Sequence, residues 1–125
     1  MAKTDSKSKI LIAEDEKPLA RALEMKLTRS GYEVTLAFNG DEALKALEKG
    51  KFALLLLDLM MPKVDGFGVL EQMRKKGNKT PAIVLTNLSQ KEDEKRAKDL
   101  GAKDFFVKSN TPIADIVKMV EKIIA

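Results

Sequence analysis

Residues 52–66, FALLLLDLMMPKVDG, decide the fold of this chain. A run of six apolar residues ends abruptly at Asp58. The run is too short for a membrane helix and too unbroken for a surface strand, so it predicts a strand buried on both faces inside a parallel sheet. Ligands of open α/β sheets bind at the carboxyl ends of the strands, which makes Asp58 a candidate site. The alternative is an aspartate that only caps the following turn.

The composition limits the chemistry that the chain can perform. Its 125 residues suffice for one domain with a core. Charged residues make up 34% and hydrophobic residues 44%, as in globular proteins. The sequence contains no cysteine and no histidine, so thiolate sites and the commonest general base are excluded. Carboxylates, lysines, hydroxyls and the backbone remain, and any metal is expected to be a hard cation bound by oxygen.

The amino-terminal sequence and the net charge indicate where the chain resides and what it binds. The start, MAKTDSKSK, lacks the apolar segment of a signal peptide, so we predict a disordered tail over residues 1–8 and a cytoplasmic location. No segment is apolar enough to span a membrane. The net charge of +4 raises the possibility of nucleic-acid binding. However, the lysines are spread over all predicted helices and aromatic residues are few, which disfavours that function and fits a solvated surface.

Strand and helix signals alternate along the whole chain. Helices are predicted from Pro18 to Gly31 and over residues 41–50, 67–76, 89–100 and 112–124, each after one strand. The strands are predicted at residues 10–13, 34–38, 52–57, 82–85 and 105–107. This alternation favours a five-stranded parallel sheet with helices on both faces. The second strand alternates in polarity and the fifth is short, so both are placed at edges. The prediction is a flavodoxin-like (βα)5 three-layer sandwich of strand order 2-1-3-4-5.

The fourth predicted helix differs from the others in its polarity. Ser89 and Glu92 have the spacing of a capping box, which predicts the start of this helix. Ala97 and Leu100 are its only clear apolar anchors. We therefore expect it to be weakly held, and weakly held elements are the ones that move in switching.

Polar residues follow four of the predicted strands at one edge of the sheet. They are Glu14, Asp15, Asp58, Thr86 and Lys108. Three carboxylates at close range repel one another, and Mg²⁺ would relieve that repulsion. A carboxylate nucleophile beside a metal, a lysine and a hydroxyl suits the acceptance of a phosphoryl group. Taken singly, these residues are equally typical of a solvated helix start, a turn and a surface lysine.

The chain resembles the receiver domain of two-component response regulators over residues 9–125. The most specific part of the match is the nine-residue stretch that begins at Asp58. The other parts are Glu14-Asp15, Leu85-Thr86, Gly101-Ala102, Phe105 and Lys108.

The resemblance implies a phosphorylation site with a bound metal. Asp58 would take a phosphoryl group from a histidine kinase, a phosphotransfer protein or a small acyl phosphate. Asp15 would be the main Mg²⁺ ligand, with Glu14 acting directly or through water. The backbone carbonyl of Met60 would complete the metal site.

The resemblance also implies how the signal is transmitted. Thr86 would close onto the phosphoryl oxygens and Lys108 would pair with them, while Phe105 would turn inward as the switch aromatic. The fourth helix, the fifth strand and the last helix would then engage an output partner protein. Such a domain is not a classical enzyme, because it catalyses at most its own phosphorylation and dephosphorylation.

The sequence departs from the family pattern at several positions. Glu14 replaces the commoner aspartate, and Ser109 stands where the family usually has a proline after a cis bond. Since a cis bond before serine costs about 2.5–4 kcal/mol, the sequence alone leaves the isomer of this peptide open. Met60 and Leu88 are apolar, at positions that in domains of this family influence the attacking water, so the resemblance implies slow self-dephosphorylation.

Two other functions fit the same fold. A pseudo-receiver would act as an adaptor without phosphorylation, and the substitutions at Glu14 and Ser109 leave room for it. An aspartyl-nucleophile hydrolase similar to haloacid-dehalogenase-type phosphatases is disfavoured. Those enzymes usually need a second acid two residues after the nucleophile, where this chain has Met60.

Overall fold

The computed structural model describes residues 8–124. The predicted tail therefore lies outside the described residues except for Ser8. In chain order the elements are β1 (Lys9–Ala13), α1 (Lys17–Arg29), β2 (Glu33–Ala37), α2 (Gly40–Lys49), β3 (Leu54–Leu57), α3 (Gly66–Lys75), β4 (Ala82–Thr86), α4 (Lys91–Asp99), β5 (Asp104–Val107), the short 3-10 helix η2 (Lys108–Asn110) and α5 (Ile113–Ile124). None of the helices within these residues is long and apolar enough to cross a membrane.

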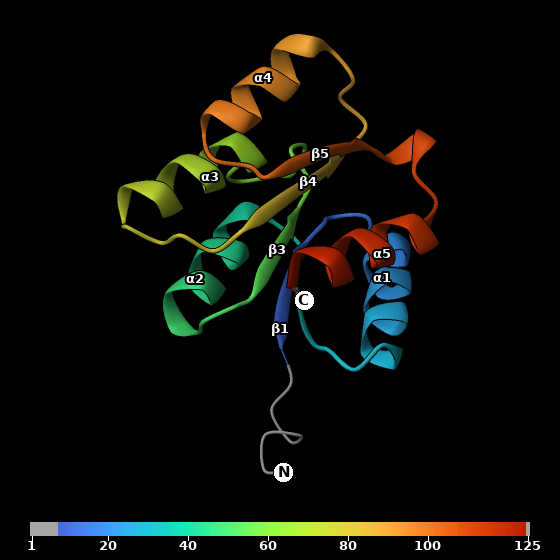
Figure 1. Cartoon of the computed structure of the whole chain (residues 1–125). Coiled ribbons are helices and arrows are strands. Elements are labelled where there is room, and N and C mark those ends of the chain that lie inside the picture. The colour runs from blue at the N-terminus through green and yellow to red at the C-terminus, as the bar shows by residue number, and fades with distance from the viewer. Residues whose placement is uncertain (1–7, 125) are drawn as a thin grey trace.

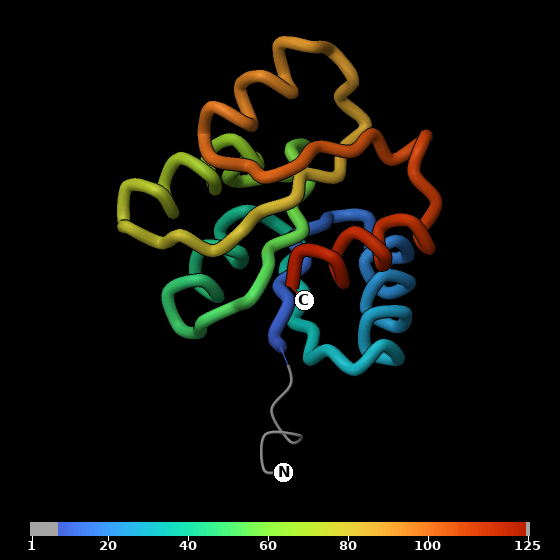
Figure 2. The backbone as a smooth tube through the Cα atoms, viewed as in Figure 1, coloured from blue at the N-terminus to red at the C-terminus, as the bar shows by residue number. Residues whose placement is uncertain are grey.

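The five strands form one parallel sheet in the order β2-β1-β3-β4-β5, as the sequence predicted. Helices α1 and α5 lie side by side against one face, and α2, α3 and α4 cover the other (Figures 1 and 2). The flavodoxin-like three-layer architecture is thereby confirmed.

Strand β3 is buried on both faces, which confirms the interpretation of its apolar run. Leu54 and Leu56 pack toward α1 and α5, whereas Leu55 and Leu57 pack toward α2 and α3. All four are at most 1% exposed. Each leucine contributes about 1.5–3 kcal/mol on burial, so this strand anchors both halves of the core.

Every strand differs from the prediction by one or two residues at one or both ends: β1, β2 and β5 begin one residue earlier, β4 ends one residue later, β2 ends one residue earlier and β3 begins two residues later. Strand β2 ends at Ala37 rather than at residue 38, because the Phe38 amide donates to the Glu42 carboxylate at the start of α2. Strand β3 begins at Leu54, and Phe52 remains half-buried before the sheet.

The predicted capping box of α4 was wrong. The helix begins at Lys91, and Gln90 occupies its N-cap without a side-chain hydrogen bond. Three acidic residues in the first turn favour the positive end of the helix dipole instead. Ala97 is the only buried residue of α4, and Leu100 after it is half-buried. The predicted polarity of this helix is therefore confirmed.

Candidate functional site

Asp58 immediately follows β3, and it is only 3% exposed. Its backbone amide donates to the Ala13 carbonyl at 2.9 Å and continues the sheet ladder by one bond. One carboxylate oxygen accepts from the Met60 amide and the other from the Lys108 ammonium, both at 3.1 Å. The carboxylate is thus fixed in position at the carboxyl edge of the sheet.

The loop after Asp58 turns sharply back, because α3 begins against the backbone of the same loop. A Cβ on Gly66 would lie 2.4 Å from the Asp58 carbonyl oxygen and 2.6 Å from the Leu59 Cα. No side chain fits there, and the Gly66 amide donates to the Leu59 carbonyl at 3.0 Å. Asp65 caps the helix by accepting from the Gly68 amide at 2.9 Å. The Asp-Gly pair of the sequence therefore sets the path of the loop beside Asp58.

The acidic pair after β1 lies next to Asp58, because β1 and β3 are neighbours in the sheet. Glu14 is 2% exposed, whereas Asp15 is exposed. Carboxylate oxygens of Glu14, Asp15 and Asp58 all lie within 4.8 Å of one another. An all-oxygen set of this kind fits Mg²⁺, which binds one or two carboxylates together with waters and phosphate oxygens.

Lys108 follows β5 and reaches across the sheet edge to the acidic cluster. Its ammonium lies 2.8 Å from a Glu14 carboxylate oxygen and 3.1 Å from oxygens of both Asp58 and Glu16. No peptide bond within residues 8–124 is cis, so the Lys108–Ser109 bond is trans. The lysine side chain is 9% exposed, and the contacts with Glu14 and Asp58 are accordingly shielded from solvent.

The protonation of the site reflects burial together with an excess of negative charge. Burial raises the pKa of Glu14 to about 7; Asp58 adds to this rise, and bonds from Lys108 and the Glu16 amide oppose it. Burial alone would lower the pKa of Lys108, but its hydrogen bonds and ion pairs with Glu14 and Asp58 raise it well above the usual value. Lys108 therefore stays charged, and its single ammonium pairs with the carboxylates of Glu14, Glu16 and Asp58. A second cation at this edge would lower the repulsion further.

Two predicted site residues lie on the neighbouring strands. Thr86 ends β4 and is fully buried, and its hydroxyl accepts from the Leu88 amide at 3.3 Å. Phe105 in β5 is half-buried beside Val84 and packs against the core on the α3 and α4 side. The fold thus brings Thr86 to the edge where Asp58 lies, but its side chain does not line the cleft.

The cleft at this edge has a volume of 220 Å³ and contains two residues that the sequence analysis did not single out. Its lining consists of Asp15, Glu16, Asp58, Met60, Asn87 and Lys108. Glu16 belongs to the acidic run after β1, and its contact with Lys108 joins residues 92 positions apart. Asn87 directly follows Thr86, so its position at the carboxyl end of a strand was the signal that could have identified it as a site residue. Met60 is 55% exposed at the mouth of the cleft.

Comparison with known proteins decides the family. The model of the response regulator receiver domain matches residues 10–121. The chain belongs to this receiver domain family. Among solved structures, the receiver domain of the Francisella response regulator 1452 matches with a TM-score of 0.88 and 30% identity over 94% of this chain and 96% of that one. Vibrio cholerae chemotaxis protein CheY4 matches with a TM-score of 0.87 and 28% identity over 94% of this chain and 99% of that one.

Curated relatives of this receiver domain are longer proteins. The transcriptional regulatory protein DltR of Streptococcus agalactiae is 44% identical over 100 residues, which are 80% of this chain and 45% of DltR. The uncharacterized transcriptional regulatory protein YkoG of Bacillus subtilis is 42% identical over 102 residues, 82% of this chain and 45% of YkoG. The receiver domain therefore spans less than half the length of these two relatives.

Proposed function

We propose that this receiver domain is a phosphoryl-accepting switch of a two-component phosphorelay, with Asp58 as the acceptor. The observation that carries the proposal is the buried Asp58 carboxylate, fixed by Met60 and Lys108 beside two further acids. A histidine kinase or a phosphotransfer protein would donate the phosphoryl group in the cytoplasm. Catalysis would be confined to the domain's own phosphorylation and dephosphorylation.

The transfer forms one bond and breaks one. A carboxylate oxygen of Asp58 attacks the phosphorus, and the bond from phosphorus to the donor imidazole nitrogen breaks. The imidazole keeps the bonding electron pair and takes up a proton from solvent, which leaves an acyl phosphate on Asp58. No histidine or other general base of this chain is needed, since phosphoryl transfer depends mainly on positioning and charge neutralisation.

Four groups at this edge of the sheet would hold Mg²⁺. They are the carboxylates of Glu14, Asp15 and Asp58 and the backbone carbonyl of Met60. When bound, the ion would neutralise the developing charge on the phosphoryl oxygens. Lys108 would exchange its contacts with Glu14 and Glu16 for one with the phosphoryl group, because it stays positively charged in the cleft.

The output would follow from the same exchange. The Thr86 hydroxyl accepts only a 3.3 Å bond from the Leu88 amide, which it would give up for a shorter bond to a phosphoryl oxygen. Phe105 would turn further inward, and the surface formed by α4, β5 and α5 would change for a partner protein. The names of the two curated relatives favour a transcriptional output for this signal.

A phosphorylation-independent adaptor is the second candidate. The favouring observation is that Lys108 already contacts Glu14, Glu16 and Asp58, so its charge is balanced by ion pairs without a phosphoryl group. Such a pseudo-receiver would present one fixed α4-β5-α5 surface to its partner.

Intact-mass measurement after incubation with acetyl phosphate and Mg²⁺ separates the two candidates. Asp58→Asn removes the proposed acceptor, and Asp65→Asn in the same loop is the matched control. The switch predicts one added, base-labile phosphoryl group on the wild type and on the control, and none on Asp58→Asn. Absence of the group at saturating donor, or its presence on Asp58→Asn, would contradict the proposal.

The lifetime of the acyl phosphate tests the role of Met60. Its apolar side chain lies at the mouth of the cleft and offers no hydrogen bond to an attacking water. We expect Met60→Asn to shorten the half-life several-fold, measured as loss of the added mass after donor removal. An unchanged half-life would show that Met60 does not limit hydrolysis.

A further inference from the structure

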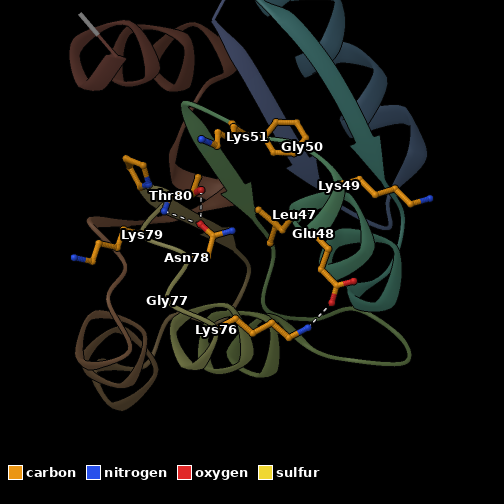
Figure 3. A pocket seen from close by; sticks show the side chains of 12 residues that line it. Leu47, Glu48, Lys49, Gly50, Lys51, Lys76, Gly77, Asn78, Lys79 and Thr80 are labelled. Carbon is orange, nitrogen blue, oxygen red and sulfur yellow. Dashed lines mark hydrogen bonds and ion pairs between the residues drawn. The ribbon is translucent and has the colours of Figure 1, made fainter.

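A second concave surface lies at the opposite edge of the sheet, before the starts of β3 and β4 (Figure 3). This groove has a volume of 680 Å³ and runs between the carboxyl-terminal ends of α2 and α3. We call it the lysine groove; its lining consists of residues 47–52 and 76–81. Since Asp58 is at the carboxyl edge, the two concave surfaces are separated by the length of the strands.

The lysine groove carries uncompensated positive charge. Glu48 and Lys76 pair with each other across its mouth (Figure 3). Lys49, Lys51 and Lys79 are exposed and make no ion pair within residues 8–124. Three positive charges therefore remain around the groove and favour a negatively charged partner.

The positions of these lysines do not follow from helix stability alone. Lys49 lies in the last turn of α2, where a cation is favoured by the helix dipole. Lys51 and Lys79, in contrast, lie beyond the ends of α2 and α3. The dipole effect falls off within the last turn, so it does not explain their charge.

An apolar recess opens from the same groove. It has a volume of 170 Å³, and Leu44, Leu47 and Met73 form its apolar wall. It shares Leu47, Glu48, Lys76 and Asn78 with the groove, so the two spaces are adjacent. A recess of this size and polarity suits one aliphatic side chain.

The arrangement selects one class of partner. Figure 3 shows Lys49 and Lys79 extending away from each other, so they do not converge on one small anion. Spread charges match the spaced carboxylates of an extended peptide. A nucleic acid has no aliphatic side chain for the recess, and Phe52 is the only aromatic residue of the groove on which a base could stack.

We propose that the lysine groove docks an extended acidic segment of a partner protein. One aliphatic side chain of that segment occupies the recess, and flanking carboxylates pair with Lys49, Lys51 and Lys79. The surface is distinct from the α4-β5-α5 surface and does not depend on phosphorylation of Asp58.

The test is an NMR titration of the ¹⁵N-labelled full chain with the peptide acetyl-Glu-Asp-Glu-Leu-Glu-Asp-Glu-amide at physiological salt. The expected result is a saturable shift of amides confined to residues 44–52 and 73–81. Replacing the peptide's leucine by alanine is expected to weaken binding several-fold. A peptide with lysine in place of every acidic residue is expected not to bind.

Charge reversal of the protein supplies the matched controls. The triple variant Lys49→Glu, Lys51→Glu, Lys79→Glu is expected to lose at least tenfold in affinity. A second triple variant reverses three exposed basic residues of α1 on the opposite face, Arg21, Lys26 and Arg29, to glutamate, and it is expected to bind as the wild type does. Both variants change the net charge equally, so a difference in their peptide affinity can come only from a local binding site.

Four results would overturn the proposal. They are equal losses in the two triple variants, shifts spread over the whole surface, no shifts at millimolar peptide, and tighter binding of a generic DNA duplex at the same residues. The first two would show non-specific attraction, the third would leave the lysines with a solvating role, and the fourth would assign the groove to nucleic acid.

Discussion

Two halves of this receiver domain differ in how firmly they are held. The acceptor half comprises β1, β3 and the loop into α3, and every residue of β3 is buried on both sides. The responsive half comprises β4, α4 and β5. Strand β4 is as fully buried as β3, but α4 buries only one residue and all four residues of β5 are only half-buried. A fixed acceptor beside a loosely packed neighbour allows a local charge event to move the neighbour alone.

The largest expected effect contrasts leucines of the two halves within one core cluster. Leu57 in β3 is fully buried, while Leu100 after α4 is partly buried in the same cluster. Leu57→Ala is expected to lower the free energy of unfolding by about 3–4 kcal/mol, and Leu100→Ala by about 1 kcal/mol, because the second side chain leaves a smaller cavity. Urea denaturation measures both, and equal losses would remove the distinction between the halves.

The next effect concerns the loop beside Asp58. Gly66→Ala is expected to lower the free energy of unfolding by about 2–3 kcal/mol, since the added Cβ meets backbone that cannot yield easily. Gly50→Ala is the control, because its nearest contact is 3.8 Å away and its φ of −141° suits any residue. If both variants unfold at the same urea concentration, the loop accommodates the added Cβ, and the acceptor half is not as rigid as described.

A pH effect arises from the buried acid of the acceptor half. The pKa of Glu14 is raised in the folded state from 4.5 to about 7, so its contribution to stability is complete below pH 4.5 and is lost as the pH rises through 7. Without Mg²⁺, we expect this loss to be about 3 kcal/mol in the wild type and absent in Glu14→Gln. Unfolding curves of both proteins between pH 4.5 and 8 provide the measurement, and parallel profiles would show that Glu14 does not titrate in this range.

The smallest effect tests backbone strain in the acceptor loop. Lys63 has a φ of 70°, in the left-handed region that favours glycine. Lys63→Gly relieves this strain and is expected to leave stability unchanged or raise it by about 0.5 kcal/mol. Lys51→Gly at a position without positive φ is expected to cost about 0.5–1 kcal/mol. A larger loss at Lys63 than at Lys51 in thermal unfolding would contradict this expectation.

The acceptor half was the more predictable from sequence. The continuous apolar run of β3, the abrupt change at Asp58 and the acidic pair after β1 are local signals, and together with the strand order they place Glu14, Asp15 and Asp58 at one edge. The Asp65-Gly66 pair ends the stretch that the sequence singled out, but the close backbone approach at Gly66 was not predicted.

The responsive half was less predictable because its contacts are not local. The predicted start of α4 was wrong, because acidic residues in the first turn, rather than a Ser89 cap, favour the amino-terminal end of the helix. The contact of Glu16 with Lys108 depends on a side-chain reach across the sheet, which no spacing in the sequence reveals. The lysine groove was missed for the same reason, because its two walls are about thirty positions apart in the chain.

Hydrogen–deuterium exchange with and without acetyl phosphate and Mg²⁺ tests the central claim most directly. The account predicts that phosphorylation changes the exchange of amides in β4, α4 and β5 and leaves that of β1 and β3 unchanged. The Asp58→Asn variant should show no difference between the two conditions. Changes centred on β1 and β3, or none in α4 and β5 when intact mass shows full modification, would contradict the account.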